Sequence, residues 1–386
     1  MQRIAILGST GSIGISALNV ISGLKDEFSV AALSTNYNIS LLSQQVKIFK
    51  PQAVCIADKD KAVEFKRGFR RGKLKVYAGE EGLCSMLKDV GIDTLLVGIV
   101  GSSALMPVLT GLDCVKRIAL ANKEALVMAG DIIMEKARRK NVRIVPVDSE
   151  HSAVFQCLEA GRKSEIKNIY LTGSGGPFLN VPEKDFKNIT PQQAINHPRW
   201  KMGKKISVDS ATMMNKGLEI IEAHHLFNVA IDNIRVLIHP EAIVHSMVEF
   251  RDGAMLAQLG VCDMRMPIQY ALTYPLRVPS PVKEVEFSIS RALNFQVPDF
   301  GKFPCLDIAY EAAKKEKAYP CVLNASNEVA VDAFLKGKIR FTDIPKVIEK
   351  VLGLHKGVNR PKLDEILKID KWARIRTKEI LNVVGN

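Results

Sequence analysis

The carboxylates that are the best candidates for metal binding or catalysis lie in the segment 146–151 (PVDSEH), directly after the apolar pair Ile144 and Val145. If the strand persists, Asp148 and Glu150 project to the same side of it. Two such carboxylates repel unless a cation lies between them, and their hard oxygen ligands suit Mg²⁺ or Mn²⁺. The spacing alone favours a plainer alternative, in which both acids sit at the surface end of a strand.

Two further segments carry groups that bind anions. The stretch 172–177 (TGSGGP) is a small-residue loop that can bring hydroxyl and backbone N–H groups onto an anion. The stretch 208–219 (VDSATMMNKGLE) combines Ser, Asn and Lys with an acid at Glu219, and Glu222 follows three residues later on the same helix face. Each segment alone fits a capping or surface role. Together with the first acid pair they indicate a phosphate site beside a metal site.

A polar, basic segment, 196–204 (NHPRWKMGK), lies between the two anion-binding stretches. Its Pro and Gly residues and Trp200, one of only 2 Trp in the chain, indicate a mobile lid over a site. A packing role for Trp200 is an equally good interpretation of this segment alone.

A glycine-rich turn stands near the N-terminus. The apolar run Ile4–Leu7 leads into 8–14 (GSTGSIG), and a helix is expected from Ser12 to Leu24. Glycines in this context let the backbone approach a pyrophosphate, which the N–H groups of the following helix then bind. The strand–turn–helix order favours a dinucleotide site over a merely tight turn.

The second expected strand indicates which dinucleotide is bound. NAD enzymes of this kind place an acid at its end to hold the ribose 2′-hydroxyl. Here residues 34–38 (STNYN) carry no acid, and their hydroxyls and amides can donate to a 2′-phosphate. NADP is therefore favoured over NAD.

The elements that must position these groups are those of an α/β protein. Up to about residue 145, apolar strands alternate with helices, which predicts a parallel sheet with helical crossovers. Motif density then rises over 148–274, prolines punctuate 275–303, and 304–386 is helical in pattern, with an apolar face in a helix begun near Thr342. We therefore predict a dinucleotide-binding domain (1–147), a catalytic and metal- and substrate-binding domain (148–274), a linker (275–303) and a C-terminal helical domain (304–386).

Composition limits the function classes. The 386 residues allow two or three domains, and the 7 cysteines are odd in number and scattered, which argues for a reducing compartment. The net charge of +13 comes from basic residues dispersed among 41 acids, so we expect a solvated basic surface and no nucleic-acid partner. Glycine, serine and proline interrupt the uncharged stretch 94–112, so we expect no membrane span. With no secretory signal at the start, a cytoplasmic location is predicted.

Seven segments, taken together and in order, resemble the 1-deoxy-D-xylulose 5-phosphate reductoisomerase family. They span nearly the whole chain, and 207–223 is the most specific: GSTGSIG (8–14), LANKEALV (120–127), PVDSEHSAVFQ (146–156), LTGSGGPF (171–178), HPRWKMG (197–203), SVDSATMMNKGLEIIEA (207–223) and NASNEVAVDAFL (324–335). The resemblance implies an N-terminal Rossmann-type parallel sheet, a central α/β catalytic domain, a C-terminal helical domain and a homodimer. It also implies conversion of 1-deoxy-D-xylulose 5-phosphate to 2-C-methyl-D-erythritol 4-phosphate, a step of non-mevalonate isoprenoid biosynthesis, with NADPH and Mn²⁺ or Mg²⁺.

The resemblance also assigns roles by position. The metal is expected on Asp148, Glu150 and Glu219, with Lys123 as a further catalytic residue. Substrate contacts are expected from Ser149, Glu150, Ser174, His197, Trp200, Met202, Ser210, Asn215, Lys216 and Glu219. Cofactor contacts are expected from Gly8, Thr10, Gly11, Ser12, Ile13, Asn36, Asn38, Asn122, Glu124 and Gly203.

One departure concerns the cofactor. Family members commonly have a glycine and then a basic residue before the position of Asn38, whereas this chain has Asn36 and Tyr37. A positive partner for the 2′-phosphate is therefore missing at this point.

Two other functions remain as alternatives. A simple NADP-dependent dehydrogenase with a structural acid cluster would be unaffected by chelators. A basic regulatory protein that senses NADP(H) would bind nucleic acid in a salt-sensitive way without turnover. Neither accounts for metal-type acids, anion loops and a lid-like segment in one chain.

Overall fold

The computed structural model describes residues 1–69, 74–200, 202–288 and 292–384. The chain divides into two compact units. The first unit comprises Met1–Ala125, Ile133–Ser152 and Asp263–Lys283. The second unit comprises Leu126–Ile132, Ala153–Cys262 and the described residues from Glu284 onward.

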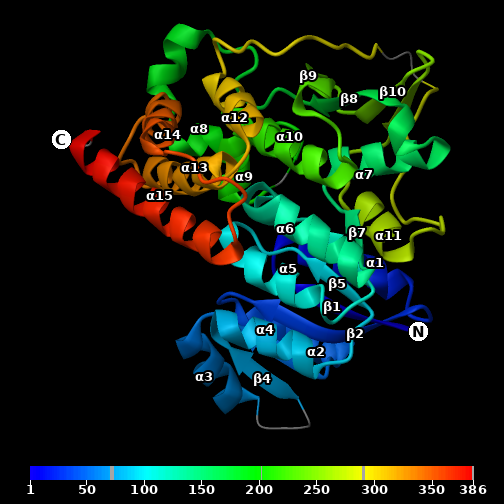
Figure 1. Cartoon of the computed structure of the whole chain (residues 1–386). Helices are drawn as coiled ribbons and strands as arrows, with labels where there is room; N and C mark the ends of the chain where they lie inside the picture. Colours follow the sequence, from blue (N-terminus) through cyan, green and yellow to red (C-terminus); the bar gives the residue numbers. More distant parts are fainter. Residues whose placement is uncertain (70–73, 201, 289–291, 385–386) are drawn as a thin grey trace. The chain divides into compact units, whose positions relative to one another are not determined.

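The first unit is built on a parallel seven-stranded sheet of order β4-β3-β2-β1-β5-β6-β7 (Figure 1). Its strands are β1 (Gln2–Leu7), β2 (Phe28–Thr35), β3 (Ala53–Ile56), β4 (Lys75–Ala78), β5 (Thr94–Val97), β6 (Arg117–Leu120) and β7 (Arg143–Pro146). Because every pairing is parallel, the carboxyl ends of the strands meet at one edge. The strand order reverses beside β1, where sheets of this kind bind nucleotides. The predicted Rossmann-type sheet is confirmed.

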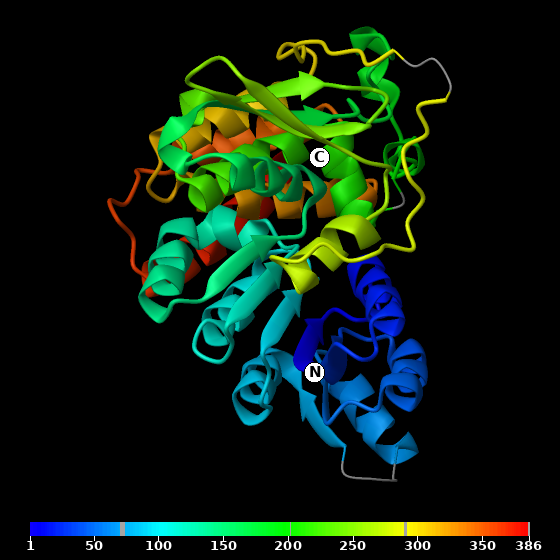
Figure 2. The ribbon, with the colours of Figure 1, turned by 90° about the vertical axis from the view of Figure 1, so that its right-hand side faces the viewer.

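Helices cover both faces of this sheet (Figure 2). They are α1 (Ser12–Gly23), α2 (Ile39–Phe49), α3 (Lys59–Gly68), α4 (Gly79–Asp89), α5 (Leu105–Gly111), α6 (Glu124–Lys140), α7 (Ser149–Cys157) and α11 (Arg265–Thr273), of which α6 and α7 continue into the second unit. Burial on both faces explains why the strands are continuous apolar runs, with Ile4–Leu7 fully buried.

Helix α11 returns to the first unit from far along the chain. It packs on α1, β6 and β7, and the Arg117 guanidinium donates to the carbonyl oxygens of Leu272 and Tyr274, both at 2.6 Å. The linear division into domains after residues 147, 274 and 303 stays a prediction. The compact units differ from it chiefly because Asp263–Lys283 belongs with the first unit.

The second unit combines a four-stranded sheet of order β11-β10-β8-β9 with helices. Strands β8 (Ile166–Gly173) and β9 (Ile234–Ile238) are parallel, and β10 (Val244–Phe250) runs antiparallel to β8 and to β11 (Met255–Leu259). The helices are α8 (Pro191–Ala194), α9 (Lys204–Ala211), α10 (Met214–Phe227), α12 (Pro304–Lys315), α13 (Tyr319–Leu335), α14 (Asp343–Leu354) and α15 (Leu363–Val384). The predicted C-terminal helical region is confirmed, and α14 buries the apolar face expected from its sequence.

Among the described residues, no helix is both long enough and apolar enough to cross a bilayer. The uncharged stretch 94–112 instead forms β5, a short 3₁₀ turn and α5.

The turn between β1 and α1 depends on close backbone approach. Gly8 has a φ of +82°, and a Cβ there would lie 2.9 Å from the Gly98 carbonyl oxygen after β5. A Cβ on Gly14 would lie 2.3 Å from the Gly8 carbonyl oxygen and 2.4 Å from Cα of Ser9. Because these neighbours are backbone atoms, no side-chain rotation relieves such contacts, and only glycine fits.

Replacing Gly14 with alanine should therefore lower the free energy of unfolding by at least about 2 kcal/mol, because the turn must open to admit the methyl group. Gly23 at the other end of α1 is the matched control, since a Cβ there meets nothing within 4 Å. Its change to alanine should be neutral or stabilise by up to about 1 kcal/mol. Urea unfolding followed by circular dichroism measures both, and equal effects would contradict this view of the turn.

Candidate active site

The glycine turn is tied to the end of the neighbouring strand β2. The Gly8 N–H donates to Ser34 Oγ at 3.0 Å, and the hydroxyls of Thr10 and Thr35 lie 2.6 Å apart. Gly11 precedes α1 without capping it by a side chain, so the first-turn N–H groups are available to a ligand. The turn thus offers the anion-binding helix terminus that a dinucleotide pyrophosphate requires.

The segment after β2 holds Asn36 and Asn38. The Asn38 side chain caps α2 by accepting from the Leu41 N–H at 3.2 Å, and the Asn36 carbonyl accepts from the Asp58 N–H at 3.0 Å. Tyr37 between them is 67% exposed. The two asparagines therefore hold the loop in shape, and the exposed tyrosine ring stands where a basic residue was expected by resemblance.

Asn122 and Glu124 follow β6, and Asn122 joins Glu124 to the loop that follows β5. The Asn122 amide donates to Glu124 Oε2 at 2.9 Å and to the carbonyl oxygens of Ile99 and Gly101, both at 3.1 Å. Its oxygen accepts from the Ala125 N–H at 2.8 Å. Asn122 and Glu124, both predicted to contact the cofactor, are buried, and their hydrogen bonds hold the loops at the carboxyl edge of the sheet.

Lys123 and Asp148 form an ion pair at the carboxyl ends of two neighbouring strands. Lys123 Nζ lies 2.6 Å from Asp148 Oδ2, and their side chains are only 9% and 15% exposed. Nδ1 of the fully buried His151 lies 3.9 Å from the same oxygen. Ser149 Oγ donates to Glu150 Oε2 at 2.6 Å. The described site thus gathers two carboxylates, an ammonium and an imidazole at the end of β7.

The expected geometry of the acid pair is wrong in one respect. Strand β7 ends at Pro146, and α7 begins at Ser149, so Asp148 and Glu150 do not lie on a strand. The Asp148 carbonyl accepts from the Ser152 N–H at 2.8 Å, which places Asp148 at the helix start. Acids are favoured at this position because the helix N-terminus carries partial positive charge. The two carboxylates are therefore held by a helix terminus.

In the second unit, Ser174 and His197 lie together. His197 Nδ1 accepts the N–H groups of Arg199 at 3.1 Å and Trp200 at 3.0 Å. In the neutral ring the proton is then on Nε2, which lies 3.3 Å from Ser174 Oγ. The imidazole N–H therefore points at the serine oxygen, and the Ser174 hydroxyl hydrogen can donate to an anion.

The loop that carries Ser174 approaches α9 through paired glycines. Gly175 and Gly176 have φ of +85° and +71°, and a Cβ on Gly176 would lie 2.7 Å from the Ser210 carbonyl oxygen. The loop and the end of α9 therefore meet backbone to backbone. This close approach places Ser174 and Ser210 on adjoining segments.

Helix α10 supplies three further predicted residues. The Asn215 amide and the Lys216 ammonium both donate to the carboxylate of Glu219, which is fully buried, as is Glu222 one turn later. The prediction that the two acids share a helix is confirmed. The first two turns of α10 thus bring a buried ammonium and a buried carboxylate together.

The remaining predicted residues lie in 196–204. The Trp200 ring is 6.5 Å from the His245 ring, the Arg199 Nε donates to the Pro240 carbonyl at 3.1 Å, and Gly203 precedes α9. Met202 is half-buried. Residue 201 lies outside the described residues.

The predicted residues thus form two groups, one in each unit. Sequence reasoning assigned no role to His151 or Gly98. His151 lies within the segment 146–156 that resembles the family. Gly98 directly follows β5, and a glycine after a strand that neighbours β1 was the sequence signal that could have identified it.

Family models match most of the chain. A 1-deoxy-D-xylulose 5-phosphate reductoisomerase model matches residues 4–130, its C-terminal domain model 144–227, and a DXP reductoisomerase C-terminal domain model 259–376. The chain belongs to the 1-deoxy-D-xylulose 5-phosphate reductoisomerase family.

Individual reductoisomerases agree over full length. The chain is 46% identical to the enzyme of Thermodesulfovibrio yellowstonii, covering 98% of this chain and 99% of that one. It is 47% identical to that of Endomicrobium trichonymphae over 100% of both. Two solved reductoisomerase structures are similar. One, from Zymomonas mobilis with NADPH, has TM-score 0.91 and 38% identity over 98% and 99% of the two chains. The other, with NADPH, fosmidomycin and magnesium, has TM-score 0.94 and 38% identity over 100% of both.

In this reductoisomerase, the change Lys123→Met should lower the free energy of unfolding by about 3 kcal/mol in chelator-treated protein, because it removes the cation from a buried carboxylate. Lys140→Met is the matched control. Lys140 pairs with Asp113 at 3.0 Å, but both side chains are nearly half exposed, so about 1 kcal/mol or less is expected. Chemical denaturation measures the free energy of unfolding of both variants. Equal losses would show that the Lys123–Asp148 pair stabilises the protein no more than an exposed ion pair does.

Proposed function

We propose that the two groups of residues described above carry out the reductoisomerase reaction. The chain converts 1-deoxy-D-xylulose 5-phosphate to 2-C-methyl-D-erythritol 4-phosphate with NADPH and a divalent metal ion, in non-mevalonate isoprenoid biosynthesis. The buried ion pair at the end of β7 carries the proposal, because it holds carboxylates at the edge of the sheet where the nucleotide turn also lies.

Asp148, Glu150 and Glu219 are proposed as the metal ligands. The donor set fits, because all three offer carboxylate oxygens and each is at least partly buried. A divalent ion held by these residues, Mn²⁺ or Mg²⁺, would supply Lewis-acid stabilisation of negative charge on the substrate. Lys123 balances the charge of Asp148 through their ion pair at 2.6 Å. Ser149 holds Glu150 through its hydroxyl and adds a contact for the substrate.

The cofactor is proposed to bind along the carboxyl edge of the first sheet. The residues Gly8, Thr10, Gly11, Ser12 and Ile13 would surround the pyrophosphate, with Asn36 and Asn38 near the ribose. Asn122 and Glu124 fix the neighbouring loop, and Gly203 adds a contact from before α9. NADPH supplies the hydride that reduces the rearranged aldehyde.

Ser174, Ser210, Asn215 and Lys216 are proposed to bind the substrate phosphate. The Ser174–His197 pair supports this, because the imidazole Nε2–H donates to Ser174 Oγ and leaves the serine hydroxyl hydrogen to donate to an anion. Lys216 supplies the positive charge from a nearly buried position. Trp200 and Met202 would cover the substrate and exclude water.

The change Glu150→Gln should reduce metal-dependent turnover at least about 100-fold, because it removes ligand charge without changing shape. NADPH affinity should stay within about twofold of the wild-type value. Glu64→Gln is the control, since Glu64 is an exposed residue of the same unit that pairs with Lys61. NADPH oxidation and a fluorescence titration of NADPH measure the two effects. Wild-type turnover in the Glu150 variant would remove this residue from the metal site.

A cytoplasmic location is also proposed. All 7 cysteines are described and form no disulfide, as expected of a protein from a reducing compartment.

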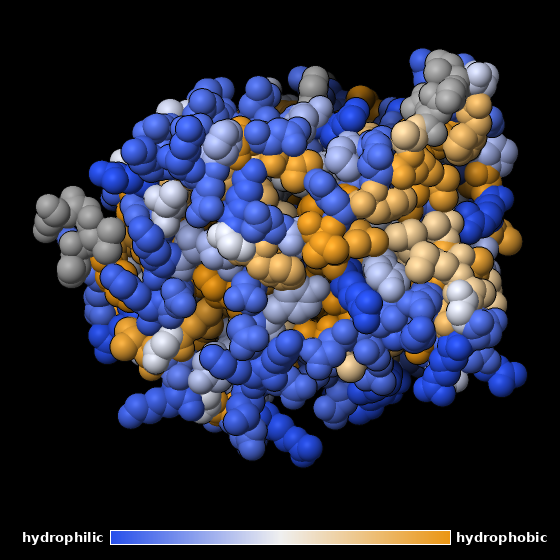
Figure 3. Space-filling view, turned by 90° about the horizontal axis from the view of Figure 1, so that it is seen from above, coloured by the Kyte–Doolittle hydropathy of each residue, from blue (hydrophilic) through white to orange (hydrophobic). Residues whose placement is uncertain are grey.

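The protein is further proposed to form a homodimer through β11, the edge strand of the second unit's sheet. Met255, Leu256 and Leu259 are 48%, 38% and 38% exposed, and they stand on both faces of the strand. An exposed apolar edge strand is a template for pairing with another chain. Orange, apolar residues gather on the right of the face in Figure 3, the side on which β10 lies in Figure 1.

The double change Met255→Lys and Leu259→Lys should convert the dimer to a monomer, because both residues lie on one face of β11 and their charges would oppose pairing. Ile48→Lys serves as the control, since Ile48 is 70% exposed in the first unit. Sedimentation velocity at micromolar concentration reads the mass. A monomeric wild type, or a lysine variant that stays dimeric, would contradict the proposal.

A further inference from the structure

A buried polar bond joins α9 to α13. Asp209, on α9 and 1% exposed, accepts from the Asn327 amide of α13 at 2.9 Å. Its other oxygen lies 2.7 Å from Lys205 Nζ, one helical turn earlier on α9. Asn327 is fully buried. The contact joins a carboxylate and an amide that are more than a hundred residues apart in sequence.

Asp209 lies in the last turn of α9, shortly before the connection to α10. The Thr212 hydroxyl donates to the Asp209 carbonyl at 3.2 Å and accepts from the Met214 N–H at 3.3 Å. Met213 between them has a φ of +62°, an uncommon value for a residue that is not glycine. The position of Asp209 therefore fixes the turn. Ser210 precedes this turn and Lys216 follows it.

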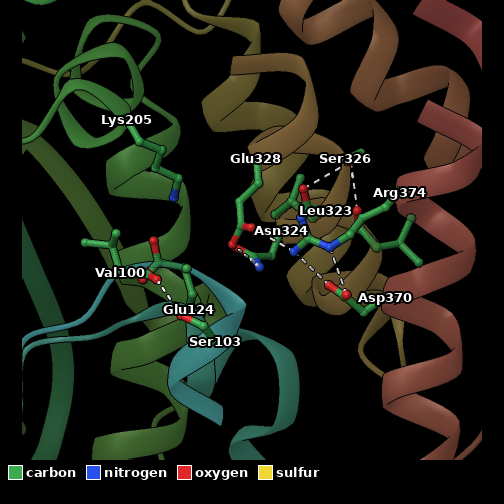
Figure 4. Close-up of polar contacts among 12 residues, drawn as sticks. Val100, Ser103, Glu124, Lys205, Leu323, Asn324, Ser326, Glu328, Asp370 and Arg374 are labelled. Carbon is green, nitrogen blue, oxygen red and sulfur yellow. Dashed lines mark hydrogen bonds and ion pairs between the residues drawn. The ribbon is translucent and has the colours of Figure 1, made fainter. Parts of the chain in front are cut away.

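Helix α13 is a firm base for this bond, because α15 holds it in place. Figure 4 shows the Arg374 guanidinium of α15 between Glu328 of α13 and Asp370. Arg374 lies 2.7 Å from Glu328 and 2.8 Å from Asp370. Helix α12 also lies near Asp209. Burial raises the pKa of the Cys305 thiol of α12 to about 12, and the nearby negative charge of Asp209 adds to this rise.

An apolar contact would join α9 and α13 with less desolvation cost. A directional hydrogen bond does something that an apolar contact does not, because it fixes the rotation of α9 about its axis. That rotation decides where Ser210, the next residue along, points.

We propose that Asn327 is a positioning residue for phosphate recognition: through Asp209 it holds the α9–α10 turn so that Ser210, Asn215 and Lys216 converge on the substrate phosphate. The inference rests on the phosphate assignment under the proposed function. It adds a role for the C-terminal helices, which carry none of the proposed ligands.

The first test compares Asn327→Ala with Asn324→Ala. Asn324 is a matched control: it lies one turn earlier on α13, is also fully buried, and its amide donates to Glu328 of its own helix at 3.1 Å. Both variants lose the same volume. Asn327→Ala should raise the KM for 1-deoxy-D-xylulose 5-phosphate about tenfold, with kcat changed less than about threefold, while Asn324→Ala leaves KM near the wild-type value. Equal KM values in the two variants would overturn the inference.

The second test restores the bond in reverse. Asn327→Asp alone sets two carboxylates against each other, whereas Asp209→Asn with Asn327→Asp rebuilds a donor and an acceptor. The double variant should recover most of the KM lost in Asn327→Asp. Calorimetric titration of the same sugar phosphate into chelator-treated protein should give the same order of affinities, and NADPH affinity should not change. A double variant no better than the single one would contradict a positioning role.

Lys216→Ala separates the two claims. If this variant raises KM and Asn327→Ala does not, the phosphate assignment stands and the positioning role is refuted. If Lys216→Ala leaves KM unchanged, the phosphate assignment itself fails and the inference falls with it.

Discussion

The requirement that every strand of the first sheet run parallel is the constraint on which the rest of the site depends. Parallel strands place all carboxyl ends at one edge, so residues far apart in sequence become neighbours there. The glycine turn after β1 and Lys123 after β6 both follow from this rule, and Lys123 meets Asp148 after β7 at 2.6 Å. The buried charge at that edge is then balanced by a neighbour rather than by water.

Much of this edge was predictable from sequence because its signals are local. The expected apolar run Ile4–Leu7 lies within β1, and α1 begins at Ser12 as expected. Strand β4 was not predicted, since Lys75–Ala78 is short, lies at the sheet edge and is not fully buried. The prediction that a strand continues through Asp148 was wrong. Acids are common both after the end of an apolar strand and in the first turn of a helix, so the sequence did not distinguish the two.

The contacts that sequence could not supply are the long-range ones. Nothing near Asn122 indicates that its amide binds the carbonyl oxygens of Ile99 and Gly101, and nothing near Asp209 indicates Asn327. Local propensity places a residue on an element, but only tertiary packing decides which buried polar group meets it. The motif that carries Asn327 was recognisable by resemblance, whereas its bond to α9 required the structure.

In this reductoisomerase, NADPH and a divalent ion serve one reaction. The most direct measurement is oxidation of NADPH by the wild-type protein with 1-deoxy-D-xylulose 5-phosphate, with Mn²⁺ or Mg²⁺, with EDTA, and with NADH in place of NADPH. We expect oxidation that needs both substrate and metal and stops with EDTA. The NADH comparison shows how far residues 34–38 discriminate between the two cofactors without a basic side chain. Folded, metal-loaded protein that oxidises no NADPH, or oxidation that EDTA leaves unchanged, would contradict this expectation.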